Sequence, residues 1–254
     1  GAGVGDALIP SAELRLQGAG ELGYGRTCCA VWNQMPVAVK PLSPELVRQR
    51  VGSAEEVRRK LGELCDLRCE HLVQLFGGCL DGEGVLLVSE YMPGGNLEQY
   101  LRHQRADPHQ PYAPPTALLF RWALAAAGAL EYLHGQCSPP LVHGNLRPSS
   151  LLLDTRQRAK LSSSRMFVRA EHRAHRGASS LEGCLYSAPE VLLGQPYTTA
   201  ADIYACAFVL WFLCTGQRPL AHLDDDGRRP PPEQALQAFA EGRPPRPGPL
   251  PPAG

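Results

Sequence analysis

Residues 141–154 read LVHGNLRPSSLLLD, and this stretch is the most informative one in the sequence. It joins a polar segment around His143, Gly144 and Asn145 to an apolar run that ends at Asp154. A short string of this kind is weak by itself, so its meaning depends on the segments that surround it.

Segments of helical character flank this stretch. Residues 116–134 are rich in Ala and Leu, and residues 200–214 form a second apolar segment of helical length. The longest apolar run, from Ala205 to Cys214, is too short to cross a bilayer, for which about 20 residues are needed. We therefore expect a buried helix there.

The sequence before residue 92 reads mainly as strands. Residues 13–40 combine alternating apolar residues with glycine-rich turns, and residues 72–91 hold two apolar runs separated by an Asp-Gly turn, which is a hairpin signal. Residues 52–67 place apolar side chains at helical spacing. Strands with one helix, followed by a mainly helical region, predict an α+β fold with a sheet-rich lobe and a helical lobe.

Six short motifs follow one another along the chain: GAGELG at 18–23, VAVK at 37–40, VSEYM at 88–92, the stretch at 141–154, APE at 188–190 and DIY at 202–204. In their order and spacing they resemble the protein kinase family, from about Leu14 to Pro245. The chain is most similar to the tyrosine-kinase-like branch, and its His-Gly-Asn loop resembles that of the second kinase domain of Janus kinases. The resemblance implies the two-lobed protein kinase fold, with a small β-rich N-lobe and a helical C-lobe.

The resemblance also predicts the domain organisation. Residues 1–12 are expected to be a leader, and residues 13–254 a protein kinase-like domain. Within that domain we assign 13–92 to the N-lobe, 93–241 to the C-lobe and 242–254 to a Pro-rich tail. On this interpretation the final C-lobe helices of the family are missing from the chain.

The positions that would carry phosphoryl transfer are degenerate. Kinases achieve this reaction by positioning and charge neutralisation, with an Asp as base and with an Asn and a second Asp holding magnesium. The resemblance places Asn145 at the base, Ser150 at the magnesium Asn and Ser163 at the magnesium Asp. An amide cannot accept the proton, and hydroxyls are poorer ligands than carboxylates for a hard dication. We therefore predict no intact catalytic residue and no metal site.

A candidate nucleotide site survives in part. Its glycines leave room for phosphate near the backbone, and its lysine supplies a point charge. Gly25, however, replaces the apolar residue that covers adenine, and Arg165 next to the lost metal position could neutralise phosphate directly. We predict weak, magnesium-independent ATP binding. The resemblance assigns this site to Lys40, Gly18, Gly20, Gly23, Ala38, Glu90, Met92 and Leu152.

Four further residues are interpreted through the resemblance. The helix Glu that orients the strand lysine aligns with Lys60, which would repel Lys40, whereas Glu56 could pair with Lys40 if the helix shifts by a turn. His143 is expected to be a core histidine, and Asp202 to cap the backbone of the catalytic loop.

Composition narrows the class of protein. The 254 residues have a formal net charge of zero, which argues against a nucleic-acid partner. Nine cysteines without a Cys-x-x-Cys pair suggest neither a disulfide framework nor a zinc site. With no signal peptide or membrane segment recognised, we expect an intracellular, cytoplasmic chain or the cytoplasmic part of a larger protein.

Three functions remain open at this point. The leading one is a pseudokinase that serves as a signalling scaffold or allosteric module, with other signalling proteins as partners, among them an active kinase. The alternative is a divergent protein kinase with weak phosphotransferase activity, and a third interpretation is a truncated copy without a stable function. Residues 246–252 also fit a basic polyproline ligand of an SH3-type domain, although a plain Pro-rich loop explains them as well.

Overall fold

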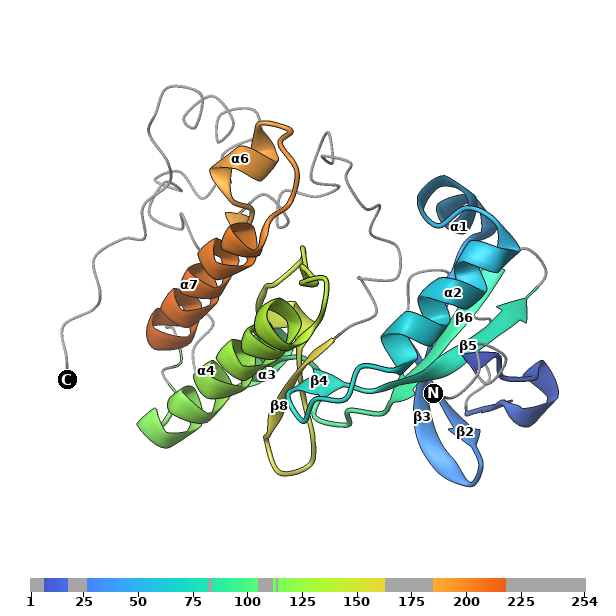
Figure 1. The fold of residues 1–254 in the computed structure, drawn as a ribbon. Helices are drawn as coiled ribbons and strands as arrows, with labels where there is room; N and C mark the ends of the chain where they lie inside the picture. Colours follow the sequence, from blue (N-terminus) through green and yellow to red (C-terminus); the bar gives the residue numbers. More distant parts are fainter. Residues whose placement is uncertain are drawn as a thin grey trace, which may run out of the picture. The chain divides into compact units, whose positions relative to one another are not determined.

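The computed structural model describes residues 7–17, 27–81, 84–104, 112, 114–162 and 185–217. The chain divides into two units. Among the described residues, the first unit holds those up to residue 93 together with Ser162, and the second holds 94–161 and 185–217. The first unit is built on a β-sheet and the second mainly on helices, which confirms the α+β prediction (Figure 1). The predicted Pro-rich tail, residues 242–254, falls outside the described residues.

The first unit contains a five-stranded sheet in the order β1-β2-β3-β6-β5. All of its neighbouring strands are antiparallel. Val37 and Val39 of the third strand lie in its apolar core, where Ala30 and Val88 from the two adjacent strands join them. The hairpin predicted around residues 81–84 joins the last two strands, because Asp81 pairs with Gly84. The strands are β1 (Arg15–Leu16), β2 (Cys28–Trp32), β3 (Met35–Leu42), β5 (Leu75–Asp81) and β6 (Gly84–Glu90).

Two helices accompany this sheet, α1 (Pro44–Arg50) and α2 (Ala54–Cys65). The predicted helix at 52–67 is thereby confirmed as α2, which begins after the N-cap residue Ser53. Its buried Leu61 packs on Gly78 of β5, where an added Cβ atom would lie 2.8 Å from the Leu61 methyl groups. Glycine at this position therefore lets the helix approach the sheet closely.

The N-terminal segment also contacts the sheet. Ala7 and Ile9 are buried, and the backbone nitrogen of Ile9 donates a 2.9 Å hydrogen bond to the carbonyl oxygen of Gly78. Glu13, at the end of the short helix η2 (Ser11–Glu13), accepts a 3.0 Å hydrogen bond from the indole nitrogen of Trp32. Residues 7–13 thus pack on the sheet of the first unit, to which they belong.

The second unit is organised around two long helices, α4 (Thr116–Glu131) and α7 (Thr199–Thr215), which pack against each other. Both correspond to predicted helices. The helix α4 continues into a π-helical turn, η3 (Tyr132–Gln136). Smaller elements complete this unit: α3 (Leu97–His103), η4 (Pro148–Ser150), the hairpin of β7 (Leu151–Leu153) and β8 (Ala159–Ser162), and α6 (Pro189–Leu192).

Trp122 fixes the hairpin and α3 to α4. Its side chain is fully buried, its indole nitrogen donates a 2.9 Å hydrogen bond to the carbonyl oxygen of Gln157, and its ring meets that of Tyr100 edge-on at 5.7 Å. The Gln157 amide in turn donates to the Tyr100 hydroxyl at 2.7 Å. A buried indole with a satisfied N–H is a strong anchor, so this cluster holds the hairpin that follows the catalytic-type loop.

None of the helices in the described part of the chain is long and apolar enough to span a membrane.

Candidate functional site

The loop that precedes η4 is organised by one buried carboxylate. Asp202 lies in the first turn of α7 and is 1% exposed. It accepts hydrogen bonds of 2.7 Å from the backbone nitrogen of His143 and 2.8 Å from that of Gly144. The predicted capping role of Asp202 is thus confirmed. Charge-assisted bonds of this kind are strong, so the loop backbone is held firmly against α7.

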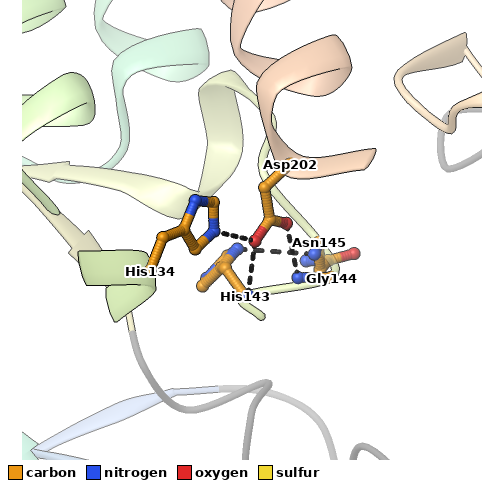
Figure 2. Close-up of polar contacts among 5 residues, drawn as sticks. All are labelled: His134, His143, Gly144, Asn145 and Asp202. Carbon is orange, nitrogen blue, oxygen red and sulfur yellow. Dashed lines mark hydrogen bonds and ion pairs between the residues drawn. The ribbon is translucent and has the colours of Figure 1, made fainter. Parts of the chain in front are cut away.

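His134 is the third partner of this carboxylate. Its Nε2 atom lies 2.9 Å from Oδ2 of Asp202, and it reaches that position from the π-helical turn at the end of α4. Figure 2 shows Asp202 between His134 on one side and the loop residues Gly144 and Asn145 on the other. No local pattern in the sequence indicated this role, because the pair is 68 residues apart and meets only through the packing of α4 on α7.

Gly144 allows the loop to take this path. Its φ angle is +68°, in the left-handed region, where a side chain is disfavoured. This backbone conformation places the Gly144 nitrogen on Asp202. The observed backbone explains why glycine suits this position.

Asn145 follows directly and is half-buried. Its backbone nitrogen donates a long hydrogen bond, 3.4 Å, to Nδ1 of His143. His143 itself is 1% exposed, which agrees with its predicted place in the core. The position predicted for the catalytic base therefore lies on an ordered loop and carries a neutral amide.

Ser150 closes the other end of the loop. Its hydroxyl donates to the carbonyl oxygen of Arg147 at 2.7 Å and accepts from the backbone nitrogen of Arg147 at 3.0 Å. The hydroxyl proton and one lone pair are therefore engaged within the chain. Ser150 was predicted only as a degenerate metal ligand, and this structural role was missed.

The candidate nucleotide residues of the first unit lie on adjacent strands. Ala38 and Lys40 belong to β3, and their cross-strand partners on β6 are Ser89 and Leu87. Glu90 ends β6, and its backbone nitrogen donates to the carbonyl oxygen of Gln74 at 2.9 Å. Two further residues of the predicted nucleotide site are described by the structure. Met92 is buried, and Leu152 lies on β7 of the second unit.

The carboxylate of Glu56 is engaged at the start of its own helix. It accepts hydrogen bonds of 2.6 Å from the backbone nitrogen of Ser53 and 3.0 Å from the Ser53 hydroxyl. These bonds hold the pKa of Glu56 below its usual value. A pairing of Glu56 with Lys40 is not observed among the described residues, while Lys60 is buried on α2.

Several predicted site residues lie outside the described residues. These are Gly18, Gly20, Gly23, Gly25, Ser163 and Arg165, together with the Pro-rich tail. Within the parts that the structure describes, His, Cys, Asp and Glu form no group of three suited to a metal ion.

The sequence of the chain defines its class. Residues 16–234 match the family described as protein tyrosine and serine/threonine kinase, and the chain belongs to this family. It is 29% identical over 238 residues to serine/threonine-protein kinase 12 of Arabidopsis thaliana, which covers 91% of this chain and 48% of that protein. It is 34% identical over 226 residues to the probable serine/threonine-protein kinase PBL26 of the same plant, covering 87% of this chain and 52% of the relative.

A relative outside plants has a similar identity. Mitogen-activated protein kinase kinase kinase 10 of Mus musculus is 29% identical over 226 residues, which are 85% of this chain and 23% of that protein. The chain thus spans between about a quarter and about half of the length of these curated relatives.

Proposed function

We propose that this chain is a catalytically impaired protein kinase-like domain, a pseudokinase that acts as a signalling scaffold or allosteric module. The observation that carries the proposal is the neutral amide of Asn145 on a loop whose backbone is otherwise held in place by Asp202. A loop that keeps its supporting hydrogen bonds but lacks the catalytic base is what we expect of a chain that retains the kinase fold without phosphoryl transfer.

The loss of the catalytic base alone should lower the rate of phosphoryl transfer substantially. A positioned general base contributes roughly 10²- to 10⁴-fold to a proton-transfer step, and an amide cannot replace it. The second change, at Ser150, replaces the amide oxygen that the family offers to magnesium. The Ser150 hydroxyl is already bound to the Arg147 backbone, which leaves one lone pair for a metal ion.

The divergent-kinase alternative rests on the relatives, several of which are named as serine/threonine-protein kinases. Under either function we propose weak ATP binding that does not require magnesium. As a pseudokinase, the chain would bind other signalling proteins, among them an active kinase, on the cytoplasmic side of the cell. An SH3-type domain at residues 246–252 is a further candidate partner.

A transfer assay tests the proposal. We expect no incorporation of labelled phosphate from magnesium-ATP into the chain or a generic substrate, and no rescue by Asn145→Asp or by Ser150→Asn alone. Residues that act as a unit are not restored one at a time, so neither variant supplies both base and metal ligands. Magnesium-dependent transfer that disappears in Lys40→Met would favour the divergent kinase instead.

A further inference from the structure

The outward side of α4 is apolar. Spacings of three and four residues place Ala117, Phe120, Leu124 and Ala127 on one side of this helix, and all four are exposed. Phe120 and Leu124 lie about one turn apart and are 60% and 67% exposed. The other side of α4 is buried around Trp122. We call the four exposed residues the α4 face.

The composition of α4 suggests that this face is covered when the chain works. A helix side that stays in water normally carries several charged residues, whereas α4 has two, Arg121 and Glu131, both exposed. Gly128 is half-buried in the same helix, where glycine is less favourable than alanine. A contiguous exposed apolar surface marks an interaction site, and a glycine beside it lets another backbone approach closely.

The two charges make the α4 face complementary to a second copy of itself. In an antiparallel pair of α4 helices with a two-fold axis at the level of Ala126, Arg121 lies at the level of Glu131 of the second copy. Both are five residues, or about 7.5 Å, from the axis. The same register places Leu124 at the level of Gly128 of the second copy, where no side chain competes for space. Each contact forms twice, since such an interface is isologous.

Both charges are available for this pairing. Glu131 accepts hydrogen bonds of 2.9 and 3.2 Å from the Gln136 amide, which is neutral and leaves the charge of the carboxylate in place. Within the described part of the chain, Arg121 takes part in no ion pair. Arg121 therefore has no intramolecular carboxylate that a second copy would need to displace.

We propose that two copies of this chain associate through an antiparallel pair of α4 helices. The α4 face forms the apolar centre, and an ion pair between Arg121 and Glu131 closes each end. This inference goes beyond the proposed function, because association through α4 does not depend on whether the chain transfers phosphate. One helix from each copy buries less than the roughly 1,200 Å² of a stable complex, so we expect a weak dimer with a Kd of about 100 µM.

Sedimentation of the whole chain from about 1 to about 200 µM measures this equilibrium, and the chain should be a monomer at the lowest concentration. A reducing agent is needed because Cys214 is exposed and a disulfide would imitate association. Leu124→Ser should weaken the dimer about tenfold or more. Leu193→Ser is the matched control, since Leu193 is 56% exposed outside α4, and it should change the Kd less than twofold.

Two charge reversals test the register. Arg121→Glu places two carboxylates at each end of the interface, and Glu131→Arg places two guanidiniums there, so each variant alone should associate at least about tenfold more weakly than the parent. An equimolar mixture of the two variants restores both ion pairs, and its Kd should lie within about threefold of the parent value. Both positions are exposed, so the variants should keep the melting temperature of the parent measured at low concentration.

Several results would overturn the proposal. A parent chain that stays monomeric at the highest concentration would mean that another segment of the chain, such as residues 232–241, or a different protein covers the α4 face. Equal effects of Leu124→Ser and Leu193→Ser would place the interface elsewhere. A mixture of the charge variants that associates no better than either alone would refute the antiparallel pairing. None of these results bears on phosphoryl transfer, which is measured separately with magnesium-ATP.

Discussion

The carboxylate of Asp202 lies 2.7 Å from the backbone nitrogen of His143, although the two residues are 59 positions apart in the chain. The same carboxylate binds the nitrogen of Gly144 and the ring of His134. One side chain at the start of α7 thus joins the end of α4 to the loop that carries Asn145. Substitution of Asp202 is therefore the most direct way to test what holds the loop in place without changing Asn145.

Replacing Asp202 with Asn should destabilise the chain by about 3 kcal/mol, because the amide brings an N–H group toward donors and leaves one of them unpaired in the interior. Chemical denaturation of the whole chain measures this change. Glu131→Gln, on the exposed end of α4, is the matched control and should stay within about 0.5 kcal/mol of the parent. An Asp202→Asn chain as stable as this control would contradict the role given to the carboxylate.

Two glycine substitutions should act in opposite directions. Gly144→Ala forces a side chain into the left-handed region at φ +68° and should lower the stability by about 1 kcal/mol. Gly62→Ala lies within α2, where an added Cβ atom meets no other atom within 4 Å, and should raise it by about 0.5–1 kcal/mol. Melting temperatures measured side by side test both, and a stabilising Gly144→Ala would mean that the loop has a different backbone.

The pKa of Glu56 should respond to its cap. The backbone N–H and the hydroxyl of Ser53 stabilise the ionised carboxylate and lower its pKa below the usual 4.5. The stabilisation that the ionised group provides is therefore present above that value and is lost as the pH falls through the lowered pKa. Titration followed by NMR should show the pKa rising toward 4.5 in Ser53→Ala, and an unchanged pKa would argue against the capping box.

ATP should raise the melting temperature only slightly, and only at high concentration. Lys40 still offers a charge to phosphate, but none of the described residues forms a cluster that would hold a metal ion. The shift should be the same with magnesium and with a chelator, and it should shrink in Lys40→Met. A shift that requires magnesium would show that a metal site survives and would reopen the enzyme alternative.

The fold could be predicted because six short motifs follow one another along the sequence in the order and at the spacing of the protein kinase family. The hairpin at 81–84, the helix α2 and the roles of Asp202 and His143 were all predicted in this way. Each of these depends on local pattern or on a position within a motif. The helix α1 was not predicted, although Ser43 before Pro44 is a typical helix start and could have indicated it.

Other features depend on contacts that no local pattern contains. His134 reaches Asp202 only after two helices have packed, and the bond between Ser150 and Arg147 depends on the turn between them. Glu56 was considered only as a partner of Lys40, whereas its carboxylate forms a capping box with Ser53 because the helix begins at Ala54. The candidate site could therefore be named by position, but its hydrogen bonds could not.

The contact of Ile9 with Gly78 covers part of the edge of a β-sheet. The strand β5 is at the edge of its sheet, and edge strands with open backbone groups recruit strands from other molecules. The bridge from Leu8 and the hydrogen bond from Ile9 occupy the outer side of β5 at Gly78. Trimming the chain to begin at Leu14 would uncover that stretch of backbone, so we expect the shortened chain to form intermolecular β-sheet through β5 more readily than the full chain.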